Sequence, residues 1–79
     1  MSQYKTIIEN ITKALVDNPS SVEVKEAQGN TTTAIEIKTA KEDLGKIIGK
    51  KGRTISAIRS IVSAIGAKNG QRVQLVILE

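Results

Sequence analysis

The chain has 79 residues, a formal net charge of +4, and neither cysteine nor histidine. This length allows one domain with a thin core. The missing residue types exclude a disulfide framework, a Cys/His zinc site and a nucleophile–base pair built on Cys or His. No apolar run approaches the ~20 residues of a transmembrane helix, and the first residues lack a signal-peptide pattern. We therefore expect one cytoplasmic domain over residues 1–79, with no membrane partner and no small-molecule substrate.

The charge is concentrated in the second half of the chain. Residues 1–40 carry four Lys and five acidic residues, a balance of −1, whereas residues 41–79 carry eight basic and three acidic residues, a balance of +5. Between Leu44 and Arg72 there are seven basic residues and no acidic residue. Such one-sided charge suggests a polyanionic partner, although taken alone it fits a solvated basic face equally well.

The first forty residues predict a helix followed by a β-hairpin. From about Ser2, a candidate N-cap, to Val16, apolar residues recur at three- and four-residue steps. The apolar set is Tyr4, Ile7, Ile8, Ile11, Ala14 and Leu15. A breaker cluster at 17–21 ends the helix. Alternation at Val22 and Val24 then indicates a strand, and after a turn at 28–30 a second strand runs over 31–39. The residues expected on one face of that strand are Thr33, Ile35 and Ile37.

The remaining residues predict two helices and a closing strand. Glu42 and Asp43 fit the first turn of a short helix, where the macrodipole favours acidic residues, and Gly49 ends it. A third helix is expected from near Gly52 to about Ile65. Its expected buried stripe is Ile55, Ile58, Ile61, Val62 and Ile65, and the short helix buries Leu44, Ile47 and Ile48. Asn69 and Gly70 then turn the chain.

The last strand alternates at Val73, Leu75 and Ile77. Its other face is also apolar, at Val76 and Leu78, which fits a strand covered on both sides, one of them by another chain. The resulting order is α-β-β-α-α-β. It predicts an α+β domain with a three-stranded sheet and helices packed on one face.

The segment Gly49-Lys50-Lys51-Gly52, called the GKKG loop below, carries the predicted chemistry. A glycine at each end of a tight turn permits positive φ and close approach of another backbone. The amides of residues 52–55 begin a helix and therefore lack intrahelical acceptors, which suits a phosphate group. Lys50 and Lys51 are expected to point into solvent, and Arg53 and Arg59 extend the positive face. A glycine pair alone is more often only a turn between helices.

Other nucleotide-binding motifs are absent. A P-loop needs G-x-x-x-x-G-K-[ST], but the spacing from Gly45 to Gly49 is one residue too short. The G-x-G-x-x-G fingerprint is also missing. With Tyr4 as the only aromatic residue, the chain cannot form the aromatic platform of an RRM. Glu42 and Asp43 are better explained as a helix start than as catalytic carboxylates, so we do not expect an enzyme or a bound cofactor.

The run Ile47-Ile48-Gly49-Lys50-Lys51-Gly52 resembles the [VI]-I-G-x-x-G core of KH domains. The element order resembles the type II form, with a helix–strand extension over about 1–28 before a core motif over about 31–79. Residues 17–19 and 42–53 are more narrowly similar to KhpA proteins, a family of small bacterial KH proteins. Gly66 and Gly70 stand where that family is expected to be Ala-rich, so the end of the third helix is the least defined boundary.

The resemblance implies a groove that holds about four nucleotides of single-stranded RNA. Carried over by position, the GKKG loop is the phosphate clamp. The groove residues that the resemblance implies are Ile47 or Ile48, Ile55 and Ile37, and basic contacts are expected from Lys46, Arg53 and Arg59. For the isoleucines, core packing is the main expected role. The resemblance also implies RNA-chaperone activity, homodimers or heterodimers with a larger KH protein, and a role in cell shape and envelope growth.

Two alternatives stay open from the residues alone. The chain could be a protein-interaction module with a vestigial loop, which the two-faced final strand supports. It could also bind single-stranded DNA, because a backbone clamp does not distinguish the two nucleic acids.

Overall fold

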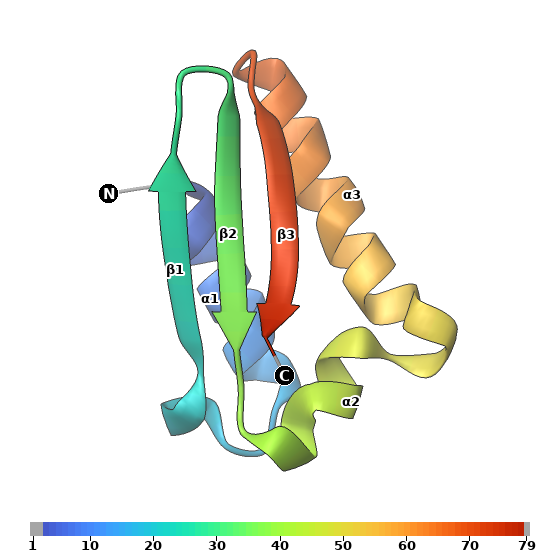
Figure 1. Cartoon of the computed structure of the whole chain (residues 1–79). Helices are drawn as coiled ribbons and strands as arrows, with labels where there is room; N and C mark the ends of the chain where they lie inside the picture. The colour runs from blue at the N-terminus through green and yellow to red at the C-terminus, as the bar shows by residue number, and fades with distance from the viewer. Residues whose placement is uncertain (1–2, 79) are drawn as a thin grey trace.

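The computed structural model describes residues 3–78, and within that range it contains three α-helices and three β-strands (Figure 1). In chain order they are α1 (Gln3–Leu15), β1 (Glu23–Gln28), β2 (Thr32–Lys38), α2 (Leu44–Ile48), α3 (Arg53–Lys68) and β3 (Arg72–Leu78). Short 3₁₀ turns occupy Pro19–Ser21, Lys41–Asp43 and Lys50–Gly52. The predicted order is confirmed. The predicted N-cap, Ser2, lies outside the described residues.

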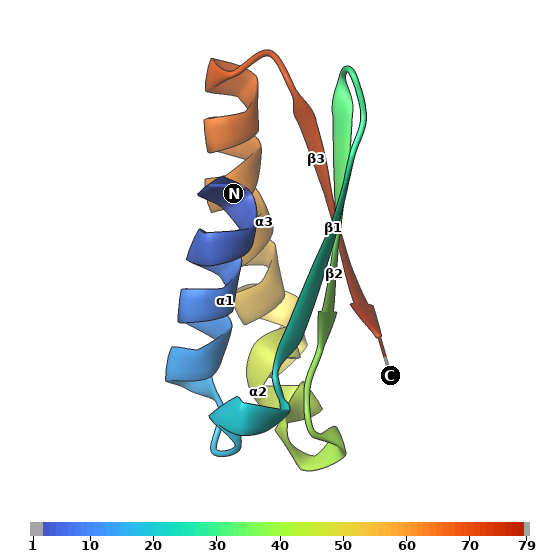
Figure 2. The same ribbon diagram turned by 90° about the vertical axis from the view of Figure 1, so that its left-hand side faces the viewer.

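The sheet has the order β1-β2-β3. β1 and β2 form the predicted antiparallel hairpin, with Glu23 opposite Lys38 and Gln28 opposite Thr33. β3 pairs in parallel with β2, because α2 and α3 carry the chain back to the end of the sheet where β2 began. All three helices cover the same face of the sheet, and the opposite face, called the outer face below, is bare (Figure 2). The α+β prediction with helices on one face is confirmed.

The core lies between the helix layer and the inner face of the sheet. Thr33, Ile35 and Ile37 alternate along the central strand β2 and lie on one face as predicted, and all three are fully buried. Period-two alternation sends these side chains to one face, and β2 is covered by its two neighbours as well as by the helices. The other large residues that are fully buried are Ile8, Ile47, Val62, Thr12 and Asp43.

Two parts of the predicted apolar stripes are wrong. Ile61 is 48% exposed, because the buried side of α3 follows Ile55, Ile58, Val62 and Gly66, and Ile61 lies beside that narrow line. In α1 the buried line is Tyr4, Ile8 and Thr12, so Ala14 and Leu15 are exposed instead of buried. A single three-stranded sheet covers only a narrow stripe of each helix, whereas the sequence pattern alone suggested a wider one.

Helix α3 extends to Lys68, three residues beyond its predicted end. Gly66 lies inside the helix and is buried against β3: a Cβ atom there would stand 2.7 Å from Val73 Cγ2 and 2.8 Å from the Gln71 carbonyl oxygen. The helix ends in a Schellman motif, in which the Gln71 amide donates to the Gly66 carbonyl at 2.7 Å and Gly70 has φ +69°. The glycine at 66 therefore permits close helix–strand packing, and the one at 70 ends the helix.

None of residues 3–78 covers the outer face of β3. Val76 is 46% exposed and Leu78 is 38% exposed, while Val73, Leu75 and Ile77 face the core. Among residues 3–78, no helix is long and apolar enough to cross a membrane.

Candidate nucleic-acid interface

The GKKG loop forms a tight turn between α2 and α3 with three residues at positive φ. Gly49 has φ +76° and ψ +169°, Lys51 has φ +56° and ψ +26°, and Gly52 has φ +73° and ψ +15°. The conformation of Gly49 is one that essentially only glycine adopts. Lys51 is the one non-glycine residue with positive φ among the described residues. The chain therefore turns within four residues, as the paired glycines predicted.

Gly49 is also closely packed against the start of α3. A Cβ atom at Gly49 would lie 2.2 Å from Thr54 Oγ1 and 2.8 Å from the Thr54 amide nitrogen. At Gly52 a Cβ atom would meet nothing within 4 Å. Gly49 is thus required both for its backbone conformation and because a side chain would collide with Thr54, whereas Gly52 is required for its backbone conformation alone.

The turn uses two of the amides that the sequence suggested were free. The Gly52 amide donates to the Gly49 carbonyl at 3.1 Å, and the Arg53 amide donates to the Lys50 carbonyl. A 3₁₀ turn at a helix start satisfies donors in this way. The expectation of free amides at these two positions is therefore wrong.

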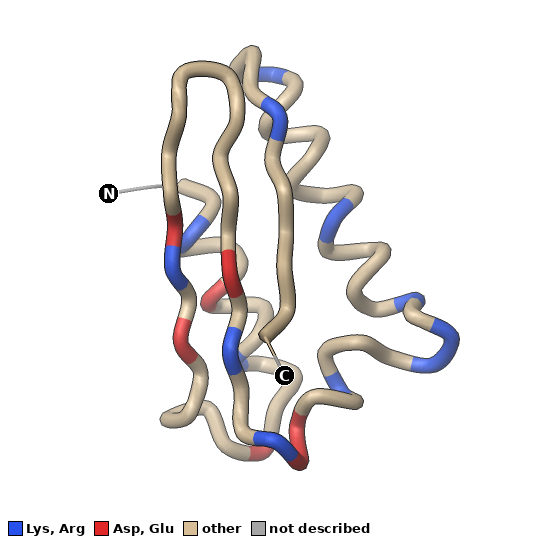
Figure 3. The backbone as a smooth tube through the Cα atoms, in the orientation of Figure 1, with Lys and Arg blue, Asp and Glu red and all other residues tan. Residues whose placement is uncertain are grey.

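The positive charge of the loop is exposed. Lys50, Lys51 and Arg53 are all exposed to solvent. Figure 3 shows Lys and Arg at the turn between α2 and α3 and along α3, with no acidic residue on either helix. The described chain from Leu44 to Leu78 contains no Asp or Glu at all. The arrangement forms a basic surface whose most protruding part is the GKKG loop.

Lys46 is engaged in ion pairs at the start of α2. Its ammonium lies 3.0 Å from Asp17 Oδ2 and 3.4 Å from Asp43 Oδ1. The hydrogen bond and charge of Asp17, followed by those of Asp43, raise the pKa of Lys46 above its usual value. The sequence grouped Lys46 with the loop as a basic contact, but two carboxylates hold it at the opposite end of α2.

Arg59 and the three isoleucines have different surroundings. Arg59 is exposed, and its Nη2 donates to the Leu75 carbonyl of β3 at 3.2 Å. Ile37 is 0% exposed in the centre of the core, so its side chain offers no surface to a ligand. Ile55 is buried, whereas Ile48 is only half-buried next to the loop. Of the predicted groove isoleucines, Ile48 has the most accessible side chain.

An apolar depression near the start of α2 was missed in the sequence. It has a volume of about 600 Å³ and is lined by Lys38, Thr39, Lys41, Leu44 and Leu78. Leu44 begins α2 and the GKKG loop follows its end, so the two features are separated by only about 8 Å of helix. The feature of the sequence that could have revealed the depression is the apolar second face of β3, because Leu78 on that face lines it.

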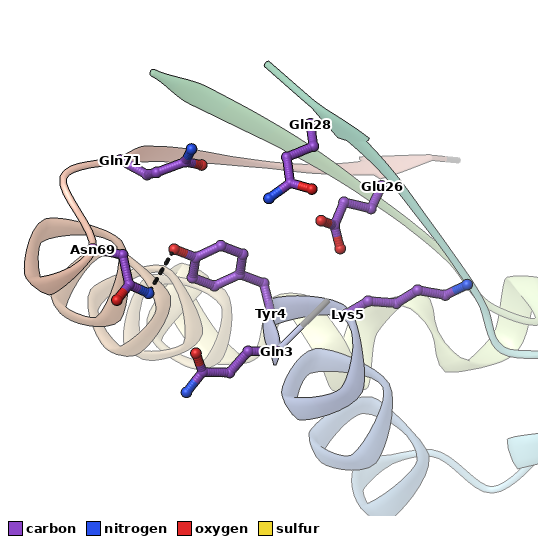
Figure 4. Close-up of a pocket in the computed structure, with 7 residues that line it drawn as sticks. All are labelled: Gln3, Tyr4, Lys5, Glu26, Gln28, Asn69 and Gln71. Atoms are coloured by element: carbon purple, nitrogen blue, oxygen red, sulfur yellow. Dashed lines mark hydrogen bonds between the residues drawn. The ribbon is translucent and has the colours of Figure 1, made fainter. Parts of the chain in front are cut away.

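A larger, polar cavity of about 670 Å³ lies between the N-terminal end of α1, the sheet and the C-terminal end of α3 (Figure 4). Tyr4 and Asn69 meet there, and Asn69 Nδ2 donates to the Tyr4 hydroxyl oxygen at 3.1 Å. The sixteen residues of α3 place this cavity about 24 Å from the GKKG loop along the helix. It is therefore separate from the GKKG loop.

Asp43 has a structural role that its place at a helix start did not reveal. Its side chain is fully buried and makes no capping hydrogen bond to α2. Instead its carboxylate accepts from the Asp17 amide at 3.2 Å, from the Asn18 amide at 3.0 Å and from Asn18 Nδ2 at 3.0 Å. With the Lys46 contact, these interactions form what we call the Asp43 cluster: Asp43, Asp17, Asn18 and Lys46.

Comparison with known proteins extends over nearly the whole chain. The model of the family described as "KhpA/KhpB, KH domain" matches residues 5–77. The RNA-binding protein KhpA of Aquifex aeolicus is 49% identical over 79 residues, covering 100% of both chains. The protein of the same name from Chlamydia pneumoniae is 48% identical over 75 residues, which are 95% of this chain and 96% of the relative.

Solved structures show the same fold at low sequence identity. Era in complex with MgGDPNP and nucleotides 1506–1542 of 16S ribosomal RNA superposes with a TM-score of 0.68 and 20% identity. An Aquifex aeolicus Era variant bound to GDP.AlF4- gives a TM-score of 0.62 and 19% identity. The matches cover 94% and 95% of this chain but only 29% and 30% of the Era chains, so they support the fold alone. The full-length matches above are decisive, and the chain belongs to the KhpA/KhpB family of KH-domain proteins.

Proposed function

We propose that this protein binds single-stranded RNA and holds the RNA backbone at the GKKG loop. The observation that carries the proposal is the loop itself: two exposed lysines between glycines, projecting from a surface with no acidic residue between Leu44 and Leu78. Relatives that match the full length are named RNA-binding proteins, which supports RNA as the ligand. Family membership also agrees with the expectation that the chain is not an enzyme.

The bases would lie beside α2. Ile48 and the depression between Leu44 and Leu78 offer apolar surface there, and Lys38 and Lys41 border it. Tyr4, the only aromatic residue, is buried, so the stacking that adds roughly 1–3 kcal/mol per base elsewhere is absent. We therefore expect modest affinity, dominated by phosphate contacts, and little base selectivity. Arg53 and Arg59 add charge along α3, while Ile37 and Ile55 support the site from the core.

The test is a titration of short single-stranded RNA followed by fluorescence anisotropy. Replacing both loop lysines, Lys50→Asp with Lys51→Asp, should weaken binding at least tenfold while circular dichroism stays unchanged. The matched control is Lys25→Asp with Lys68→Asp, because both of these lysines are exposed and the change in net charge is the same. Equal weakening in the two double variants would contradict a specific role for the loop.

RNA and DNA are distinguished by competition. If RNA is the natural ligand, an RNA oligomer should displace labelled RNA at lower concentration than a DNA oligomer of matched sequence. A DNA oligomer that competes better would favour single-stranded DNA.

Self-association is the second candidate, favoured by the apolar outer face of β3. Val76 and Leu78 are large apolar residues that stay exposed in the single chain. Pairing two chains would also join two weak RNA sites and so raise the effective affinity for RNA. Light scattering should then report a dimer for the wild type and a monomer for Val76→Lys. A wild type that stays monomeric at high concentration would exclude the homodimer. A heterodimer with a larger KH protein, RNA-chaperone activity and a role in cell shape and envelope growth remain predictions from the family resemblance. Cytoplasmic location remains a prediction from the sequence pattern.

A further inference from the structure

The Asp43 cluster and the GKKG loop lie at the two ends of the same short helix. Asp43 immediately precedes α2 and Gly49 immediately follows it, so five residues, or about 8 Å of helix, separate them. A helix of five residues has no stability of its own in water. Its orientation must therefore come from contacts with the rest of the molecule.

Those contacts are of two kinds, apolar and polar. Ile47 is fully buried and anchors one side of α2 in the core. Leu44 and Ile48 are half-buried on the same helix, and α2 also packs against α3. Beyond Ile47, polar fastening comes from the Asp43 cluster, whose four hydrogen bonds all end on one carboxylate.

The cluster joins parts of the chain that are distant in sequence. Asp17 and Asn18 belong to the connection after α1, and they contact Asp43 across separations of 26 and 25 residues. Lys46 completes the cluster by bridging Asp17 and Asp43. The N-terminal extension is thereby tied to the helix that leads into the loop.

We propose that Asp43 is a positioning residue for nucleic-acid binding: it fixes the direction of α2 and so holds the GKKG loop in its binding geometry. The inference rests on the proposed function of that loop. Asp43 itself is fully buried, so its side chain offers no surface to RNA. Its effect passes through α2 to Gly49.

This role can be separated from simple electrostatics, because the two predict opposite changes in RNA affinity when Asp43 is replaced by Asn. Asp43→Asn removes a negative charge and releases Lys46 from one ion pair. The first change makes the protein more positive and the second frees a cation from one of its partners, so charge alone predicts tighter RNA binding. Positioning predicts weaker binding, because Asn keeps one acceptor oxygen but places an NH2 donor where the backbone amide of either Asp17 or Asn18 needs an acceptor.

The experiment compares Asp43→Asn with Glu42→Gln, its exposed neighbour, in RNA titrations at 25 °C. Glu42 accepts only one hydrogen bond, from Asn18 Nδ2 at 3.3 Å, and its replacement gives the same change in net charge. We expect Asp43→Asn to raise the Kd at least fivefold, with shifted Gly49 and Gly52 amide resonances, and Glu42→Gln to leave the Kd unchanged or lower it up to twofold. Binding by Asp43→Asn that is as tight as that of Glu42→Gln would overturn the proposal.

Two further variants complete the test. Ile8→Ala destabilises the core through α1 without touching the cluster, so at a temperature where it is folded it should bind RNA like the wild type. If Ile8→Ala weakened binding as much as Asp43→Asn, lost stability would be the cause and the proposal would fail. If Asp43→Asn does not fold, Asn18→Ala takes its place, because it removes one neutral donor group of the cluster and no charge. RNA binding that is at least twofold weaker supports the positioning role of Asp43, and unchanged binding contradicts it.

The same assay tests RNA binding by the GKKG loop independently of the role of Asp43. If Lys50→Asp with Lys51→Asp binds RNA as well as the wild type, the loop assignment itself fails. If that variant loses binding while Asp43→Asn keeps it, the loop assignment stands and only the positioning role is lost.

Discussion

At the scale of single residues, Gly49 and Asp43 are the most constrained positions near the interface, and for different reasons. Gly49 combines a backbone conformation reserved for glycine with a close approach to Thr54. Asp43 is a buried carboxylate whose four donors come from three residues. The first constraint was predictable from the paired glycines. The second was not, because Asp17 and Asn18 are far from Asp43 in sequence and nothing in the local pattern joins them.

Gly49→Ala should destabilise the fold by about 1–3 kcal/mol, since the variant must adopt strained dihedral angles and its Cβ atom would overlap Thr54 Oγ1. Gly45→Ala is the matched control in the preceding helix, where a Cβ atom meets nothing within 4 Å. It should stabilise the protein by about 0.5–1 kcal/mol. Urea denaturation measures both, and equal stability of the two variants would contradict the description of the loop.

The pH dependence of stability should report Asp43. Burial acts to raise its pKa, but hydrogen bonds from the Asn18 side chain, from the amides of Asp17 and Asn18 and from Lys46 outweigh burial, and the pKa lies below the usual 3.8. The ionised group therefore stabilises the fold above that usual value, and this contribution is lost as the pH falls through the lowered pKa.

The wild type should be more stable than Asp43→Asn at pH 7, and the difference should shrink below about pH 4. Thermal unfolding of both proteins between pH 7 and pH 2.5 measures it. A difference that stayed constant over this range would show that the carboxylate charge does not contribute.

At the scale of secondary-structure elements, sequence periodicity located every helix and strand. Alternation along residues 31–39 was sufficient to identify the buried face of β2, because the central strand is covered on its inner face along its whole length. The same reasoning failed for Ile61, since the width of a helix's buried stripe depends on how much sheet lies beneath it. The end of α3 was also misplaced, because Gly66 lies inside the helix in close contact with β3, and the local pattern does not show that contact.

Gly66→Ala tests that packing. Alanine favours a helix, yet here its Cβ atom would stand 2.7 Å from Val73 Cγ2, so we expect the variant to lose about 1–3 kcal/mol of stability. Ser63→Ala, at an exposed position one turn earlier in α3, should change stability by less than about 0.5 kcal/mol. A stable Gly66→Ala protein would mean that α3 and β3 are not in close contact.

At the scale of the whole molecule, one helix layer covers one face of one sheet, and the charge is divided between the two halves of the chain. The basic half forms α2, the GKKG loop and α3, whereas four of the seven acidic residues in the described part of the chain lie on α1, β1 and β2 (Figure 3). This division was visible in the sequence. The sequence could not show that Lys46 is held by carboxylates or that Ile37 is inaccessible, because both depend on tertiary contacts.

Binding of single-stranded RNA should weaken as salt rises. If the loop and its neighbours neutralise about three phosphates, the slope of log K against log salt should be about −2, and removing Lys50 and Lys51 as donors should reduce its magnitude by about 1.4. Titrations at four salt concentrations measure both slopes. A wild-type affinity that did not change with salt would mean that phosphate contacts do not dominate.

The most direct test of the central claim is a map of amide chemical shifts during titration with single-stranded RNA. If the GKKG loop holds the RNA, the largest changes should lie within residues 48–58, covering the loop and the first turns of α3. Changes confined to α1 or β3, with Gly49 to Gly52 unaffected, would contradict the account.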